Sequence, residues 1–588
     1  MATGLPFWED FSSTETTYAN PGLWMWGRSV RINDGMAILP PSIRVATFDG
    51  IDSVGSPYSV TDVLAKGYAD KLVSQSIDLT TVAEADRNSV WLSYNFQMKG
   101  NGEIPDAGDR LLVLFLDELG EWVPVDTIEN DGSIEPDIFY TSFVQVKDEK
   151  YFHEDFKFRI QNFARLSGPY DTWHVDYIYL NKGRTIDDIS FPDRTLVEPL
   201  TNLFGIYRTV PTDHFKADPA MLTKPYSVGS NMRIGNKQPI FFSAFAKVSY
   251  IINGDTTEEN ETVMNLNDTI ETPLEAGKYL QLEGGEVPDL LPYVDLADSI
   301  QLDYKYAINT RDNDPNFIEF PGDDVGDYDP AIYAPIDFRS NDTTRTSYFL
   351  LNKYAYDDGV AEYGAGLNQP GAQLAYKYTL VGVKKANITA LEMYFPRFGD
   401  ESSQVLELRI WNSLERDPVY TEVVTLQRSE ENITWVKKLI PPGVNVDSIF
   451  YIGWKQNAAA VIAVGLDKNT DTGDQMYYNT TGGWEQNVLV HGSLILRPVF
   501  GELGEVSGLE DEENKLVVYP NPSSGTFFFN GVAEMISVYD MTGRSIPIHT
   551  ESTATDTRLV LSAPTQGIYI IKAHIDGHIK TAKVLVRQ

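Results

Sequence analysis

Short runs in which apolar and polar residues alternate recur along the whole chain, and Gly, Asn, Asp or Pro separates one run from the next. The runs over residues 110–116, 156–160, 246–251 and 405–410 show the two-residue period of a strand with one buried face. No window carries a helical stripe of more than three turns. The pattern therefore predicts an all-β protein built from β-sandwiches or jelly rolls.

The length of the chain predicts several domains. At about 150 residues per domain, 588 residues correspond to about four domains, and turn-rich or acidic stretches mark the expected boundaries. In chain order we expect a jelly-roll domain over 1–190, a linker and lead-in strand over 191–235, an immunoglobulin-like domain over 236–312, an acidic connector over 313–340, a second jelly-roll domain over 341–502, an acidic linker over 503–513 and a terminal immunoglobulin-like domain over 514–588.

The chain is strongly acidic, with 84 acidic and 47 basic side chains and a formal net charge of −37 at pH 7. Such a surface repels phosphate backbones, so we expect no nucleic-acid partner. The absence of cysteine excludes thiol nucleophiles, disulfides and zinc–thiolate sites. The longest apolar stretch, about nine residues, is too short for a transmembrane segment, and residues 1–6 lack the features of a signal peptide. We expect a chain that is either cytosolic or has lost its signal peptide.

The first predicted domain opens on the strand Phe7–Phe11, which carries Glu9 and Asp10, and closes on the strand 173–180, which carries Asp176. The late strand has the spacing W-x-x-D-x-I. This order resembles MAM-like and other concanavalin-type jelly rolls, in which the acidic opening strand and the late strand lie side by side. The resemblance implies a fold rather than an activity.

The sequence contains no recognisable catalytic motif. None of its seven histidines has an H-E-x-x-H spacing, and G-x-S-x-G elbows, P-loops and dinucleotide fingerprints are absent. We therefore predict no catalytic residue and a protein that is not an enzyme. A glycosidase pair among the acidic residues has no sequence signature, so a hydrolase remains an alternative.

Calcium is the cofactor that the acidic residues would suit, because hard cations take carboxylate and amide oxygens. The loop 467–474 places such oxygens at alternate positions, and the opening strands of both jelly rolls carry acidic pairs. The alternative is a set of solvated turns and strand ends. The candidate ligands for structural Ca²⁺ are Glu9, Asp10, Asp176, Asp357, Asp358, Asp467, Asn469 and Asp471.

Tryptophans could form a platform for sugar rings, which stack on aromatic faces while polar groups bind the hydroxyls. The alternative, burial in a sandwich core, is the usual place for such residues. The candidates are Trp24 and Trp26 in the first jelly roll and Trp411, Trp454 and Trp484 in the second.

The C-terminal 75 residues carry four ordered motifs: a YPNP-x-x-G opening, a YDMTGR hairpin, a G-I-Y strand and a terminal strand with a lysine. Residues 514–588 hold five acids and seven bases, a net charge of +2, which leaves −39 for the rest of the chain. The motif residues are Tyr519, Pro520, Asn521, Pro522, Gly525, Tyr539, Asp540, Gly543, Arg544, Gly567, Tyr569 and Lys583.

These motifs strongly resemble the type A C-terminal sorting domain of the type IX (Por) secretion system of Bacteroidetes. The resemblance implies export across the outer membrane and contact with translocon, shuttle and sortase components. It also implies removal of the tail before Lys515, with the protein left at the cell surface or released.

Five tripeptides of the form Asp-(Ser/Thr)-apolar resemble the O-glycosylation acceptor of Bacteroidetes. Enzymatic glycosylation of a folded domain needs an exposed hydroxyl. The alternative is that the tripeptides are unmodified strand-edge residues. The candidate acceptors are Ser53, Thr127, Thr269, Ser299 and Ser448.

Together these features favour a non-enzymatic binding or adhesion protein, exported by the type IX system and displayed on the surface or secreted. Its ligand would be a surface glycan or a protein that the sequence does not identify. Two alternatives remain: a glycan-binding protein for polysaccharide capture, and a hydrolase with an unrecognised carboxylate pair.

Overall fold

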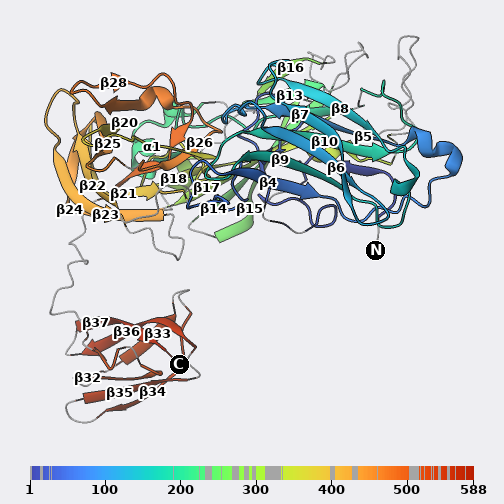
Figure 1. Cartoon of the computed structure of the whole chain (residues 1–588). Coiled ribbons are helices and arrows are strands. Elements are labelled where there is room, and N and C mark those ends of the chain that lie inside the picture. The colour runs from blue at the N-terminus through green and yellow to red at the C-terminus, as the bar shows by residue number, and fades with distance from the viewer. Residues whose placement is uncertain are drawn as a thin grey trace. The chain divides into compact units, whose positions relative to one another are not determined.

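A computed structural model gives the architecture of the chain (Figure 1). It describes residues 3–587 except 14–16, 26, 28, 190, 192, 224–225, 232–241, 253–254, 268–276, 284–289, 295–298, 311–332, 334, 397–403, 427–434, 460, 502–515, 517, 522, 531–532, 534, 541–543, 553–555, 563–564 and 576–577.

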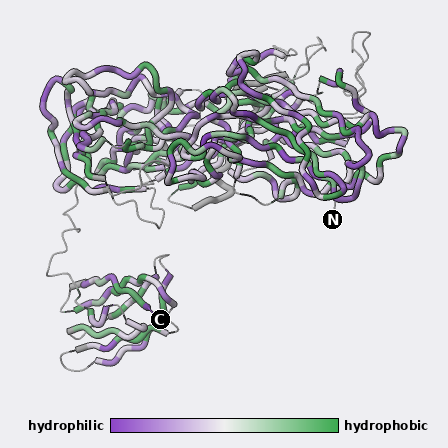
Figure 2. Tube along the Cα trace, viewed as in Figure 1, coloured by the Kyte–Doolittle hydropathy of each residue, from purple (hydrophilic) through white to green (hydrophobic). Residues whose placement is uncertain are grey.

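The chain divides into two compact units, unit 1 (Met1–Gly501) and unit 2 (Glu502–Gln588). The regular secondary structure of both units consists almost entirely of strands, which confirms the predicted all-β, multi-domain fold. Figure 2 shows the alternation of hydrophilic and hydrophobic residues that generates these strands. Among the described residues, no helix is both long and apolar enough to cross a membrane.

The first module of unit 1 (residues 3–189) is a sandwich of two antiparallel sheets. One sheet has the order β2-β3-β10-β5-β8, with β1 paired to β10, and the other has the order β4-β9-β6-β7. Their bounds are β1 Phe7–Glu9, β2 Arg31–Asn33, β3 Val45–Phe48, β4 Lys66–Val73, β5 Trp91–Met98, β6 Arg110–Leu116, β7 Trp122–Glu129, β8 Phe139–Gln145, β9 Phe158–Arg165 and β10 Trp173–Asn181, with short 3₁₀ turns η1 Glu84–Ser89 and η2 Glu149–Tyr151.

Strand β1 lies beside β10, with Glu9 opposite Ile178, as the resemblance to jelly rolls implied. The ring of Phe7 packs edge-on against Trp24 at 5.2 Å and against Phe158 at 5.0 Å. These rings join the two sheets, because Phe7 comes from one sheet and Phe158 from the other. Edge-to-face packing of this kind stabilises a core beyond the area that it buries.

The middle module (residues 194–351) contains two sheets, with the orders β11-β13-β16 and β12-β18-β17-β14-β15. Its strands are β11 Arg194–Leu196, β12 Thr209–Pro211, β13 Tyr226–Asn231, β14 Ser243–Ile252, β15 Asp255–Asn267, β16 Tyr279–Glu283, β17 Ile300–Asn309 and β18 Thr343–Leu351, and its short helices are α1 Thr212–Ala217, η3 Pro219–Met221, α2 Leu291–Val294 and η5 Phe338–Asp342.

The boundaries of this module differ from the predicted ones. The segment 191–235, expected as a linker with a lead-in strand, supplies β11, β12, β13 and α1. Strand β18, expected at the start of the second jelly roll, pairs along its length with β17 of the middle module. Alternation shows that a segment is a strand, but it does not show which strand will pair with it.

The third module (residues 352–501) has three sheets, with the orders β23-β22-β25-β20-β27-β28, β24-β21-β30 and β19-β26-β29. Their bounds are β19 Tyr363–Ala365, β20 Gln373–Thr379, β21 Lys385–Tyr394, β22 Gln404–Trp411, β23 Tyr420–Leu426, β24 Trp435–Asp447, β25 Ile449–Gln456, β26 Val464–Asp467, β27 Met476–Asn479, β28 Glu485–Gln486, β29 Ser493–Leu494 and β30 Leu496–Phe500, with the turn η6 Gly473–Gln475.

Hydrophobic and polar contacts join the three modules. One continuous hydrophobic core runs from Leu196 in the middle module to Phe500 in the third. Asn341 of η5, which is fully buried, donates through Nδ2 to Asp10 at 3.0 Å and to Asp193 at 2.7 Å. Arg31 of the first module pairs with Glu362 of the third at 2.9 Å.

Unit 2 is a small sandwich with its own core of Phe527, Phe529, Val538 and Ile571. Its sheets have the orders β31-β32-β35-β34 and β33-β36-β37. The bounds are β31 Val518–Tyr519, β32 Thr526–Asn530, β33 Met535–Asp540, β34 Ile548–Ser552, β35 Asp556–Leu561, β36 Gly567–Ile575 and β37 His578–Val586.

The buried His214 generates a prediction about pH. Its Nδ1 lies 2.8 Å from the hydroxyl of Tyr354, and its ring packs on Phe500 at 5.3 Å. Burial lowers the pKa of His214 from 6.5 to about 4, so between these values only the unfolded chain takes up the proton. Protonation of the unfolded state therefore destabilises the wild type as the pH falls through this window, by at most about 1.4 kcal/mol per pH unit.

We expect the stability advantage of the wild type over His214→Gln to shrink as the pH falls from 6.5 to 4. Denaturation of both full-length proteins across this range measures it. The comparison removes the contributions of the other titrating groups, which both proteins share. A difference in stability that stays constant with pH would show that this imidazole is not held neutral by the fold.

Candidate functional site

A groove of about 490 Å³ lies on the outer face of the six-stranded sheet of the third module. On β22, Leu408 and Ile410 point into the core, so Arg409 and Trp411 point to the opposite face. The groove is lined by Gln373, Arg409, Trp411 and Trp484 and by the loop 414–418.

Arg409 forms the floor of this groove and is held in a fixed orientation. Its Nη1 donates to Oε1 of Gln373 at 2.7 Å, and its Nε donates to Oε1 of Glu407 at 2.7 Å. The intervening strand β25 places Gly453 opposite Arg409. A Cβ at Gly453 would lie 1.9 Å from the carbonyl oxygen of Leu374, so only glycine fits at this point of the sheet.

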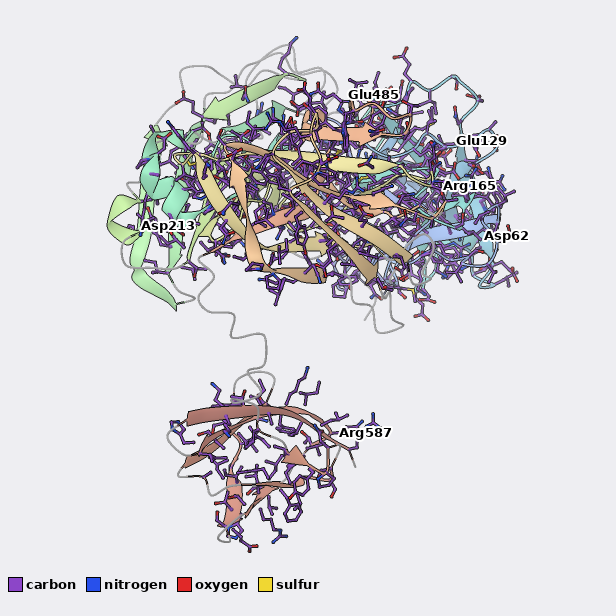
Figure 3. The ribbon with its side chains drawn as sticks, turned by 90° about the vertical axis from the view of Figure 1, so that its left-hand side faces the viewer. Asp62, Glu129, Arg165, Asp213, Glu485 and Arg587 are labelled. Carbon is purple, nitrogen blue, oxygen red and sulfur yellow. The ribbon has the colours of Figure 1, made fainter. Side chains whose placement is uncertain are left out.

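Two tryptophans form the wall beside this floor. Trp484 lies in the turn between β27 and β28, just before Glu485, which Figure 3 labels. Its ring meets Trp411 edge-on at 5.5 Å, with an interplanar angle of 83°. Trp411 is only 2% exposed, whereas Trp484 is half-buried and leaves part of its ring accessible. The groove therefore combines an accessible ring with fixed polar groups.

Two of the other candidate tryptophans, Trp24 and Trp454, do not form a platform. Trp24 and Trp454 are core residues, with exposed fractions of 1% and 0%. The indole Nε1 of Trp24 donates to Glu9 at 2.9 Å. Trp26 lies outside the described residues.

In the first module, the predicted cation ligands Glu9, Asp10 and Asp176 are buried and accept hydrogen bonds from the protein. Glu9 accepts from the backbone of Phe11 at 2.8 Å as well as from Trp24. Burial raises the pKa of all three carboxyls, that of Glu9 to about 7, and the neighbouring charge of Asp10 adds to the shift for Glu9 and Asp176.

Asp176 accepts from both the backbone and the hydroxyl of Ser42, at 3.1 and 2.9 Å. Protein donors thus surround the acidic groups of the first module. Calcium binding at these three residues stays a prediction.

In the third module, the structure brings together three of the predicted ligands. The side chain of Asp467 accepts from the backbone of Asp358 at 3.0 Å and of Asn469 at 2.7 Å, and Asn469 donates to Asp358 at 3.0 Å. Asp357 instead faces Arg497, with which it forms a buried ion pair. Asp471 accepts from His491 at 2.8 Å and from two backbone amides. Calcium binding here also stays a prediction.

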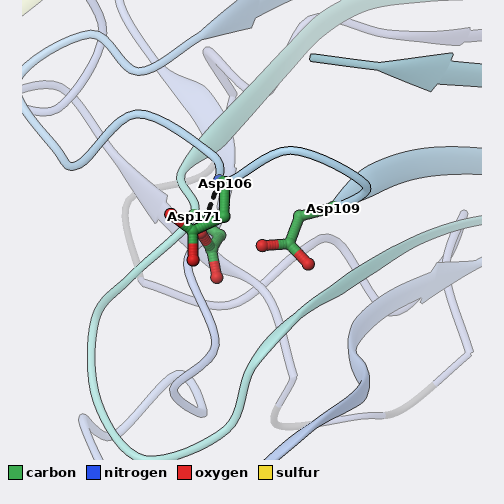
Figure 4. Close-up of side chains that lie close together, drawn as sticks. All are labelled: Asp106, Asp109 and Asp171. Atoms are coloured by element: carbon green, nitrogen blue, oxygen red, sulfur yellow. Dashed lines mark hydrogen bonds between the residues drawn. The ribbon is translucent and has the colours of Figure 1, made fainter. Parts of the chain in front are cut away.

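A cluster of Asp106, Asp109 and Asp171 was not foreseen from the sequence (Figure 4). One carboxylate oxygen of each residue lies within 4.8 Å of the corresponding oxygen of the other two. Nζ of Lys66 donates to Asp106 at 3.0 Å and to Asp109 at 2.7 Å, so an ammonium group already offsets part of the negative charge of this cluster. Asp171 lies far along the chain from the other two, and no local motif could have connected it to them.

In unit 2, the motif residues hold the sheet ends together. Asn521 donates to the carbonyl of Lys583 at 3.0 Å and accepts from the amide of Leu585 at 2.8 Å, which joins the opening motif to the last strand. Gly525 adopts a φ of 112°, a conformation that favours glycine. Asp540 accepts from the guanidinium of Arg544 at 3.0 Å across the hairpin.

The remaining motif residues have different environments. Tyr569 is buried and follows Gly567 at the start of β36, and Tyr519 is 47% exposed beside Pro520. Tyr539 packs under Lys572 at 5.7 Å. Pro522 and Gly543 lie outside the described residues.

The five candidate acceptors for O-glycosylation differ in exposure. Thr127 and Ser448 are exposed, Ser299 is half-buried, and Ser53 is only 6% exposed. Thr269 lies outside the described residues. An exposed hydroxyl is thus available at Thr127 and Ser448, and their modification stays a prediction.

Comparison with known proteins gives one family. The family described as "Secretion system C-terminal sorting domain" matches residues 517–587. A search of curated proteins finds no match to this chain.

Three solved structures are similar to the chain at low identity. The N-terminal CBM22-1-CBM22-2 tandem domain from Paenibacillus barcinonensis Xyn10C is 9% identical with a TM-score of 0.20, over 79% of this chain and 99% of that one. The BSP domain of a biofilm associated protein is 8% identical with a TM-score of 0.13, over 98% of each chain. Parabacteroides merdae beta-glucuronidase is 9% identical with a TM-score of 0.16, over 55% of this chain and 32% of that one.

The family match covers the four motifs and the sandwich that they form in unit 2. Such a domain indicates export to the cell surface or the extracellular space and implies contact with the secretion machinery. Residues 517–587 are a C-terminal sorting domain of the type IX secretion system, and the chain is a cargo of that system.

Proposed function

We propose that this chain is a non-enzymatic binding or adhesion protein of the cell surface or extracellular space, and that it binds glycans through the groove of the third module. The observation that carries the proposal is the pairing of the half-buried Trp484 with the fixed guanidinium of Arg409 in one groove. A sugar presents an apolar ring face and a rim of hydroxyls, and this groove offers a partner for each.

The fixed orientation of the polar groups in the groove supports a role in glycan binding. Arg409 is held by Gln373 and Glu407, so its remaining hydrogen-bonding capacity is oriented before a ligand arrives. Preorganisation reduces the entropy lost on binding. The exposed loop residues Glu415, Arg416 and Asp417 add donors and acceptors at the rim of the groove.

We further propose that the sorting domain presents its ordered sheet ends to translocon, shuttle and sortase components. Asn521 supports this proposal, because its side chain joins the opening motif to the last strand. The charge difference between the basic tail and the acidic remainder allows the machinery to distinguish the signal from the cargo.

The groove generates a prediction about binding. A glycan array probed with the full-length protein should identify ligands, and Trp484→Ala should weaken their affinity about tenfold through loss of the ring contact. Trp435→Ala is the matched control, since Trp435 is 40% exposed on β24 and does not line the groove. Isothermal titration calorimetry measures both variants.

Unchanged affinity in Trp484→Ala, or an array without any bound glycan, would refute the groove as a glycan site. Release of smaller sugars from a bound glycan would instead favour the hydrolase alternative.

The sorting domain generates a prediction about export. Deletion of residues 514–588 should strand the protein in the periplasm, because the signal that the machinery reads is gone. Fractionation of the native host followed by immunoblotting measures its location. Truncated protein at the cell surface would show that another part of the chain carries an export signal.

A single residue tests the structural basis of that signal. Asn521→Ala removes two hydrogen bonds between the opening motif and β37, so we expect unit 2 to lose about 1 kcal/mol of stability and the exported fraction to fall. Glu551→Ala, which removes an exposed ion pair with Arg558, should leave both unchanged. If Asn521→Ala destabilises unit 2 but is exported normally, the secretion machinery does not need this contact to recognise the signal.

A further inference from the structure

A second cavity, of about 800 Å³, lies where the three modules of unit 1 meet, and we call it the central cleft. It is lined by residues of all three modules, among them Asp34 and Asn101 of the first, Glu198 and Arg208 of the middle, and Glu362 and Lys468 of the third. Its volume falls in the range of about 300–1,000 Å³ typical of small-ligand sites. It shares no lining residue with the groove that contains Trp484.

The walls of the central cleft are fixed by contacts between modules. Arg31 pairs with Glu362 at 2.9 Å and donates to the carbonyl of Ala361 at 2.6 Å. Asn469 of the third module donates to Asp34 of the first at 3.1 Å. The cleft therefore exists before a ligand binds, and these contacts set its width.

Most acidic groups of the central cleft are already satisfied by the protein. Asp34 and Asp358 both accept from Nδ2 of Asn469. Besides its pairing with Arg31, Glu362 accepts from the amide of Lys468 at 3.0 Å. The carboxylate of Asp471 is bound by His491 and by backbone amides. The protein thus takes up part of the acceptor capacity of each of these carboxylates.

Unlike these acidic groups, two basic groups that line the central cleft have no oppositely charged partner among the described residues. The guanidinium of Arg208 lies over the ring of Tyr348 at 5.1 Å, and its Nε is buried without a hydrogen-bond partner. No acidic residue in the described part of the chain forms an ion pair with it. Lys468 donates from Nζ to the carbonyl of His491 at 2.7 Å, and no carboxylate in the described ranges pairs with it. Arg208 and Lys468 thus offer cationic donors that no carboxylate of the described residues pairs with, which suits an anionic group of a ligand.

The uncharged residues that line the cleft indicate which groups a ligand would carry besides an anionic group. The amides of Asn101 and Asn202 donate to the carbonyls of Gly35 at 2.8 Å and Ile206 at 3.1 Å. No hydrogen bond among the described residues engages their Oδ1 atoms, which leaves acceptors for hydroxyl groups. Glu198 lines the same cleft, and burial raises the pKa of its carboxyl above the usual value.

We propose that the central cleft binds an acidic oligosaccharide, with a sugar carboxylate on Arg208 and sugar hydroxyls on Asn101 and Asn202. An acidic peptide would supply the charge but few hydroxyls, so the lining favours the sugar. This site is independent of the groove, and its ligand class goes beyond the glycan binding proposed there.

The test uses the full-length protein and calorimetric titration with four acidic tetrasaccharides, which carry galacturonate, glucuronate, mannuronate or a terminal sialic acid. Each is paired with its carboxyl-reduced counterpart, which keeps the hydroxyls and loses the charge. We expect at least one acidic member to bind about tenfold more tightly than its reduced partner. Hexaglutamate serves as the acidic peptide.

Variants locate the binding. Arg208→Gln should weaken the acidic ligand about tenfold and leave the reduced one unchanged, whereas Arg208→Lys should retain part of the preference. Arg339→Gln makes the same change of charge at an exposed arginine outside the cleft and should have no effect. Trp484→Ala should also have no effect, which separates this site from the groove.

Four results would overturn the proposal: none of the acidic tetrasaccharides binds, the reduced forms bind equally well, hexaglutamate binds in their place, or Trp484→Ala abolishes binding. Thermal melting shows whether Arg208→Gln is folded. If it is not, the comparison of acidic with reduced ligands on the wild type and on Arg208→Lys gives the answer.

Discussion

The stacking of Tyr207 on the third module fixes the arrangement on which unit 1 depends. Its ring lies 4.5 Å from that of Tyr354 and 4.8 Å from that of Tyr356, and its hydroxyl donates to the carbonyl of Thr379 at 2.8 Å and accepts from the amide at 3.0 Å. Hydrophobic burial alone has no direction, but stacked rings with a fully paired hydroxyl have one. The residue that follows Tyr207 in the chain is Arg208, which lines the central cleft.

Unit 1 also buries several carboxyl groups in its core, and each of them needs a partner there. Glu9, Asp10 and Asp176 each accept hydrogen bonds from backbone or side-chain donors, and Asp357 pairs with Arg497. Burial of an unsatisfied carboxylate would be strongly unfavourable, so these donors are a condition of the fold rather than an addition to it. They also explain why a cluster of acidic residues in this chain is not by itself a cation site, as Lys66 shows at Asp106 and Asp109.

The sequence permitted the prediction of features that depend on local order. Alternation predicted the β-sandwiches, the acidic opening strand and the late strand indicated the pairing of β1 with β10, and four motifs identified the sorting domain. The sequence did not permit the prediction that β18 pairs with β17, that Asp171 lies close to Asp106, or that Arg208 lines the central cleft. These depend on contacts between distant segments, and period and propensity contain no information about such partners. Trp484 was one of several candidates, and only its exposure distinguishes it from Trp454.

Arg409 and Arg208 both line cavities, but the protein binds their guanidinium groups differently. These partners indicate the role of each arginine better than its position in a cavity does. Arg409 is bound by two side chains, so it contributes a fixed shape and a few oriented donors, as recognition of a neutral sugar rim requires. Arg208 rests on a tyrosine ring and lacks a paired acid among the described residues, so its charge is available to a ligand that brings one. The two cavities therefore differ in the ligand charge that they suit, although both belong to one acidic unit. A surface with a net charge of −39 outside the basic tail repels polyanions at long range, so an acidic ligand would have to be short enough to place its charge within the cleft.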